Sequence, residues 1–154
     1  MAVAIRVWDL PPAFGKCAQL TRRSVQVPGY LKSQDALRKA GIDEVLVYCV
    51  NDGAVMQAWA ADQKVKGSCI TFLADTRCEL TEALGMVMDH PGPMDALGNL
   101  RCKRFVMVLD DGVIKHLAVS EADGDPAGDN EPDGPVTKLT RVEAVLAAIA
   151  AAKM

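Results

Sequence analysis

Paired cysteines are missing from this 154-residue sequence: its five cysteines are an odd number, and no two form a CxxC pair. This pattern argues against a disulfide framework and against a zinc ribbon. Long apolar runs are missing too, since none approaches the roughly 20 residues that span a bilayer. Residues 1–7 are too short and too lightly charged for a secretory signal. We therefore expect a soluble, cytoplasmic protein with reduced thiols.

Signals for several other classes of protein are also missing. The net charge of −3 gives no electrostatic reason to expect nucleic acid or a membrane as a partner. There is no Gly-rich phosphate loop and no triad-like arrangement around a serine. The two histidines, His90 and His116, are isolated, and the acidic stretch 123–133 lacks the spacing of an EF-hand. We expect neither a metal nor a cofactor.

The positive signal is an alternation of strand and helix patterns. The run 44–50 is continuously apolar, which suits a strand buried on both faces. Asp110-Asp111-Gly112 predicts a tight hairpin between two later strands. Residues 121–135 are acidic and rich in Gly and Pro, which predicts a surface loop. Strands are predicted over 2–10, 44–50, 69–73, 105–109 and 113–119, and helices over 29–40, 52–62, 76–87 and 140–153.

Two capping boxes mark the starts of the last two predicted helices. They are Thr76-x-x-Glu79 and Thr140-x-x-Glu143, in which the two side chains of each box can satisfy free backbone donors reciprocally. The order of elements predicts an α/β protein with a mixed sheet flanked by helices. With no repeat and no linker in the sequence, residues 1–154 are expected to form a single domain that includes the C-terminal helix 140–153.

Four segments carry a more specific signal. They are Val27-Pro28-Gly29-Tyr30, Tyr48-Cys49-Val50-Asn51-Asp52, Phe72-Leu73-Ala74-Asp75 and Lys103-Arg104-Phe105-Val106-Met107-Val108. In their order and spacing they resemble the atypical, type II class of peroxiredoxins. The resemblance implies a thioredoxin-like three-layer sandwich in a redoxin domain. It also implies an antioxidant enzyme that reduces hydrogen peroxide or alkyl hydroperoxides through a cysteine sulfenic acid.

The resemblance further implies partners and site residues. The expected reductant is a thiol, such as a thioredoxin-like protein, glutaredoxin or glutathione, and the expected assembly is a homodimer. In the family a thiolate attacks the peroxide, and an arginine stabilises the thiolate and the leaving hydroxide. Arg104 matches that arginine. The matching cysteine loop should read Pro, three residues, Thr, two residues, Cys.

The cysteine loop of this chain departs from that pattern. In register with Phe14, Gly15 takes the threonine position and Ala18 the cysteine position, so that Cys17 falls one residue early. Counting back from Pro28 instead places Arg22 at the cysteine position. A third register uses Thr21-x-x-Ser24, but a serine hydroxyl cannot form a sulfenic acid. Cys17 is therefore the candidate attacking residue, with Arg104 as its electrostatic partner.

Two functions remain open from the sequence. One is a thiol peroxidase that uses Cys17 and Arg104 in a one-cysteine cycle, in which an outside thiol reduces the sulfenic acid. The other is a catalytically degenerate relative that serves as a dimeric scaffold or binding module, because a fold can outlast its chemistry. Cys78, in the first turn of a predicted helix, is a rival reactive thiol. Cys102 is a conceivable resolving thiol, and Cys49 is expected to be structural.

Overall fold

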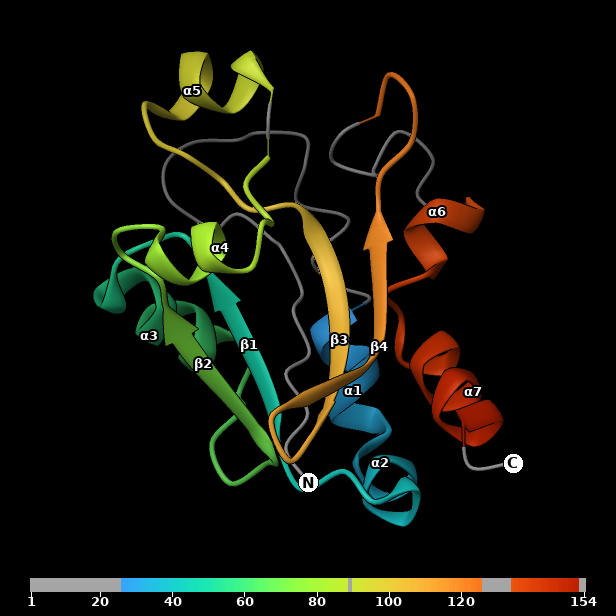
Figure 1. Ribbon diagram of the computed structural model, residues 1–154. Helices are drawn as coiled ribbons and strands as arrows, with labels where there is room; N and C mark the ends of the chain where they lie inside the picture. Colours follow the sequence, from blue (N-terminus) through green and yellow to red (C-terminus); the bar gives the residue numbers. More distant parts are fainter. Residues whose placement is uncertain (1–25, 89, 126–133, 153–154) are drawn as a thin grey trace.

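The computed structural model describes residues 26–88, 90–125 and 134–152 (Figure 1). The strand predicted over 2–10 lies outside these residues. No helix in the described ranges is long and apolar enough to cross a membrane. In chain order the elements are α1 (Gln26–Lys32), α2 (Gln34–Ala40), β1 (Val45–Cys49), α3 (Gly53–Asp62), β2 (Ile70–Ala74), α4 (Glu79–Ala83), α5 (Pro91–Leu97), β3 (Arg104–Asp110), β4 (Val113–Ser120), α6 (Pro135–Lys138) and α7 (Val142–Ala152).

The four strands form two pairs. β1 and β2 run parallel, whereas β3 and β4 run antiparallel, with Arg104 opposite Ser120. Within the described residues these pairs are separate two-stranded sheets. Between the two pairs, the Tyr48 and Phe105 rings meet edge to face with centroids 6.2 Å apart. The α/β class, with both parallel and antiparallel pairing, is confirmed.

Helices cover the strand pairs and close the core. α3 packs on β2, where the Trp59 and Phe72 rings meet edge to face with centroids 4.7 Å apart. α7 lies against α1 and α2. One apolar cluster contains Val45 and Val47 from β1, and Val106 from β3, together with side chains of α1, α2, α3 and α7. The described elements therefore share one principal core.

The helix predicted over 29–40 is two helices in the structure. α1 begins at Gln26, earlier than predicted, and the chain turns at Ser33 before α2 begins. Tyr30 and Leu37, from the predicted apolar face, are both fully buried. Gly41 ends α2 as predicted, because its φ of 89° lies in the left-handed region that glycine adopts without a Cβ penalty.

The capping box predicted at Thr76 is wrong. The helix begins at Glu79 and ends at Ala83, and its side-chain cap is Asp75. One Asp75 carboxylate oxygen accepts from the backbone N–H of Leu80 at 3.2 Å. The other accepts from the backbone N–H of Thr81 at 2.9 Å and from its hydroxyl at 2.6 Å. A buried carboxylate with three donors is a stronger cap than an exposed threonine hydroxyl, because charge-assisted hydrogen bonds are stronger.

Replacing Asp75 by alanine is therefore expected to lower the free energy of unfolding by about 1–3 kcal/mol, because it leaves buried donors unsatisfied. Asp52→Ala is the matched control. The Asp52 carboxylate caps α3 through one exposed hydrogen bond, from Val55 N–H at 2.9 Å, and its loss is expected to cost about 1 kcal/mol or less. Urea unfolding of both variants measures the difference. Equal losses would contradict the assignment of Asp75 as a buried cap.

The predicted hairpin is confirmed. β3 and β4 are joined by Asp111 and Gly112, with φ values of 50° and 76°. Two successive left-handed residues are typical of a type I′ turn, whose twist matches that of the flanking strands. Register shifts once, between Val108 and Leu109. The hairpin carries Arg104 at the start of β3.

Two helices differ in how well the sequence predicted them. α5 was not predicted. His90 precedes it, and its Nδ1 accepts a hydrogen bond from the backbone N–H of Gly92 at 3.1 Å. The C-terminal helix is confirmed as α7, whose buried residues Val142, Val145 and Ile149 lie on the predicted apolar face. The single-domain boundaries 1–154 stay a prediction.

Candidate functional site

Arg104 is the first residue of β3, and only 4% of its surface is exposed. Side chains alternate along a strand, so Arg104 shares its face with Val106 and Val108. Both valines belong to the principal core, together with Val27 of α1 and Val142 of α7. The Arg104 side chain therefore extends from the face of β3 on which α1 and α7 pack.

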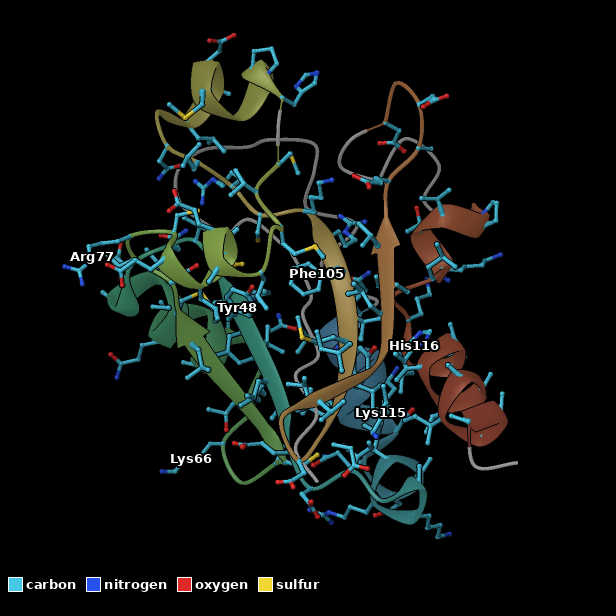
Figure 2. The ribbon with its side chains drawn as sticks, in the orientation of Figure 1. Tyr48, Lys66, Arg77, Phe105, Lys115 and His116 are labelled. Atoms are coloured by element: carbon cyan, nitrogen blue, oxygen red, sulfur yellow. The ribbon has the colours of Figure 1, made fainter. Side chains whose placement is uncertain are left out.

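The opposite face of β3 fixes the start of this strand against β1. Phe105 is fully buried and packs with Tyr48 and Met107 in a second apolar cluster. Figure 2 shows the Tyr48 and Phe105 rings turned toward one another between the two strands. Such an aromatic pair adds about 0.5–1.5 kcal/mol beyond its burial. The backbone that carries Arg104 is thus held by packing on both faces.

Positive charge is concentrated around the start of β3. Lys103 makes an ion pair with Glu121 at 2.8 Å, in which both side chains are partly exposed. Such a pair contributes about 1 kcal/mol or less. The buried Arg104 guanidinium follows it directly in the chain. A fixed buried cation of this kind favours a thiolate over a thiol and stabilises developing negative charge.

A second buried arginine lies nearby in the chain, and no pattern in the sequence predicted it. Arg101 is 6% exposed. Its Nη1 donates to the carbonyl oxygen of Val50 at 2.7 Å, and its Nε has no hydrogen-bond partner among the described residues. Burial lowers the pKa of the Arg101 guanidinium, while the nearby Cys49 and Cys102 raise it. Arg101 thereby joins the end of β1 to the segment that leads into β3.

A cavity of about 370 Å³ opens at the same end of the molecule. It is lined by the residues that follow β1 (50–52), those that follow β2 (76–78) and those that precede β3 (99–100). Figure 1 shows that β1 and β2 both point toward the end of the molecule at which β3 begins. The lining includes polar side chains of Asn51, Asp52 and Asn99, so this end of the strands combines a polar hollow with buried cations.

No disulfide joins any two of the four described cysteines. Cys49 and Cys102 are buried, with 1% and 0% of their surfaces exposed, and Cys69 is partly exposed. The sequence predicts Cys78 in the first turn of a helix, but in the structure Cys78 precedes α4. It adopts a φ of 63° and is 4% exposed. Burial limits access of solution reagents to Cys49, Cys78 and Cys102. Cys49 is a buried residue of the strand, as the sequence predicted.

The remaining predicted site residues lie outside the described residues. These are Cys17 and the other positions weighed for the cysteine loop, Gly15, Ala18, Thr21, Arg22 and Ser24. The chain enters the described part at α1, directly after this segment. The structure therefore places Arg104 but does not place Cys17. Within the described residues, no three His, Cys, Asp or Glu side chains come together in a way that could hold a metal ion.

Comparisons with known sequences agree on one family. The family model described as Redoxin matches residues 23–132. Peroxiredoxin-2E-2, chloroplastic, of Oryza sativa subsp. japonica is 35% identical over 95 residues, which are 62% of this chain and 42% of that protein. Hybrid peroxiredoxin hyPrx5 of Haemophilus influenzae is 34% identical over 121 residues, 78% of this chain and 46% of that protein. The chain spans less than half the length of these relatives.

Solved structures agree with the sequence relatives. Reduced Prx3 from Vibrio vulnificus superposes with a TM-score of 0.69 at 30% identity, over 97% of this chain and 80% of that one. Its complex with hydrogen peroxide gives a TM-score of 0.70 at 32% identity, over 97% and 77% of the two chains. The likeness confirms the predicted thioredoxin-like arrangement of strands and helices.

Proposed function

Since this chain belongs to the Redoxin family and is a peroxiredoxin, we propose that it is a thiol-dependent peroxidase. Its substrates are hydrogen peroxide or alkyl hydroperoxides. The observation that carries the proposal is the buried cation at the start of β3, Arg104, on a strand held on both faces. A fixed guanidinium supplies the electrostatic stabilisation that attack by a thiolate on an O–O bond requires.

We assign the attacking sulfur to Cys17. Its thiolate bonds to one peroxide oxygen, the O–O bond breaks, and the other oxygen leaves as hydroxide or alkoxide. The cysteine is thereby oxidised to a sulfenic acid. An outside thiol then condenses with the sulfenic acid to give a mixed disulfide and water, and a second thiol equivalent restores the cysteine. Arg104 stabilises the thiolate before attack and the leaving oxygen during attack.

The partners and location follow from the same proposal. The reductant is a small or protein thiol, such as glutathione, glutaredoxin or a thioredoxin-like protein. The assembly is a homodimer, and the protein acts in the cytoplasm, where thiols are kept reduced.

The test uses stopped-flow mixing at pH 7 without added thiol to measure how many equivalents of peroxide the reduced protein consumes. A peroxidase with one attacking cysteine is expected to consume one equivalent of hydrogen peroxide per chain in a fast phase and then stop. Addition of glutathione or of a glutaredoxin system should restore turnover. Slow consumption with no fast equivalent would instead favour a degenerate relative that serves as a scaffold or binding module.

A further inference from the structure

Three buried polar side chains meet where α1 begins, β4 ends and α7 begins. They are Gln26, Ser120 and Thr140, of which Gln26 is 6% exposed and the other two are fully buried. Gln26 Nε2 donates to Thr140 Oγ1 at 2.8 Å. Ser120 Oγ donates to the carbonyl oxygen of Val136 at 2.8 Å. The two hydroxyl oxygens lie 3.4 Å apart. Segments that are far apart in the chain thus share one polar cluster.

The number of protons fixes the direction of these hydrogen bonds. A serine hydroxyl has one proton, and Ser120 uses it for Val136. Thr140 must therefore be the donor in its contact with Ser120, and it already accepts from Gln26. The chain of donors runs from Gln26 through Thr140 and Ser120 to the Val136 carbonyl. Thr140 is the only member that both accepts from another side chain and donates to one.

The backbone of Thr140 is held as well. The Tyr30 hydroxyl donates to the Thr140 carbonyl oxygen at 2.9 Å, and Tyr30 is fully buried. Burial raises the pKa of Tyr30, and the negative charge of Glu143 raises it further. Tyr30 therefore keeps its proton and its role as donor at neutral pH. Because two residues of α1 bond to Thr140, the start of α7 is fixed relative to α1.

The chain of hydrogen bonds reaches the position of Arg104. Ser120 is the residue directly opposite Arg104 in the β3–β4 ladder. Side chains of directly opposed residues lie on the same face of a sheet, with Cβ atoms about 4.5–5.5 Å apart. A displacement of Ser120 therefore moves the backbone that carries the guanidinium. Thr140 is connected to Arg104 through a single intervening residue.

From this geometry we propose that Thr140 is a positioning residue. Through Ser120, the Thr140 hydroxyl sets the place of the Arg104 guanidinium. The kinetic consequence rests on the proposed function, whereas the positional consequence does not. Thr140→Val keeps the shape of the side chain and removes the hydroxyl, so that Ser120 loses its donor and Gln26 its acceptor. Thr140→Ser keeps the hydroxyl and is the rescue variant.

The positional test is the ¹H–¹⁵N signal of the Arg104 Nε–H group, assigned by its loss in Arg104→Lys. We expect this signal to shift in Thr140→Val and to stay in place in Thr140→Ser. Val145→Ala is the matched control, since it removes buried apolar contact from α7 and leaves the polar cluster intact. An unmoved signal in folded Thr140→Val, or an equal shift in Val145→Ala, would overturn the proposal. If Thr140→Val fails to fold, Gln26→Leu removes the first donor of this series of hydrogen bonds. Its effect is judged by the same Arg104 signal.

The kinetic test compares two reagents for the attacking thiol. In Thr140→Val the rate with hydrogen peroxide is expected to fall about tenfold, because reacting groups tolerate little misplacement. Measured at a pH where the thiol is fully ionised in both proteins, the rate of alkylation by iodoacetamide should stay within about twofold, since alkylation places no oxyanion beside Arg104. A peroxide rate equal to the wild-type rate, with the signal shifted, would contradict a role in catalysis. A wild-type protein with no fast peroxide reaction would refute the proposed function and leave the signal to decide the positional claim.

Discussion

Cys17→Ser is expected to abolish the fast consumption of peroxide, with a loss of about 10³-fold or more in rate. A serine hydroxyl has a pKa far above that of a thiol, is not ionised at pH 7 and forms no sulfenic acid. The four other cysteines remain in this variant, and the structure shows three of them buried. Stopped-flow measurement of the second-order rate constant with hydrogen peroxide tests the expectation.

Cys78→Ser is the control for Cys17→Ser. Cys78 lines the cavity at the end of β1 and β2. It is also the rival reactive thiol predicted from the sequence. Because its side chain is buried in the structure, we expect Cys78→Ser to react with peroxide within about twofold of the wild-type rate. The reverse result, with Cys17→Ser active and Cys78→Ser inactive, would move the attacking sulfur to the start of α4.

The second large effect is expected at Arg104. Arg104→Met should lower the peroxide rate constant by about 10²–10³-fold, the usual loss when one preorganised stabiliser of developing negative charge is removed. Methionine fills much of the same buried volume, so the fold should persist, as near-ultraviolet circular dichroism would show. The pKa of the Cys17 thiol should also rise in Arg104→Met, because a thiolate loses a cation that favours it.

Arg104→Lys and Lys103→Met separate geometry from charge. Arg104→Lys keeps the positive charge but loses the planar fork of donors, so its rate should fall between that of Arg104→Met and that of the wild type. Lys103→Met removes the neighbouring, partly exposed cation, whose partner is Glu121. Its rate should stay within about threefold of wild type, since exposed charges are screened. Equal losses in Lys103→Met and Arg104→Met would mean that net charge alone matters.

Elements specified by local sequence were predicted well. β1 forms where the sequence has its continuous apolar run. The predicted turn forms at Asp111 and Gly112, which both adopt the left-handed backbone conformation that such a turn requires. The start of α4 was mispredicted because its side-chain cap lies outside the spacing of a capping box. Asp75 reaches Leu80 and Thr81 from the end of β2, whereas a capping box is recognised only at its fixed spacing.

In the candidate site, one arginine could be predicted from its flanking sequence and another could not. Arg104 was found through the resemblance of its flanking residues, and its burial in the structure fits the role. Arg101 was missed, because nothing in its neighbours distinguishes a buried arginine from a surface one. Its burial and its bond to Val50 arise from packing between distant segments. Likewise, the sequence predicts Thr140 in a capping box, whereas the structure places its hydroxyl against Gln26.

We propose that this peroxiredoxin is an active peroxidase with Cys17 as its attacking sulfur. The proposal is tested by brief treatment of the reduced protein with one equivalent of hydrogen peroxide at pH 7, trapping of sulfenic acid with dimedone, and mass spectrometry of each cysteine. We predict rapid labelling confined to Cys17, with Cys49, Cys69, Cys78 and Cys102 unlabelled. Slow labelling spread over all five cysteines would contradict the claim and indicate a scaffold that has lost its chemistry.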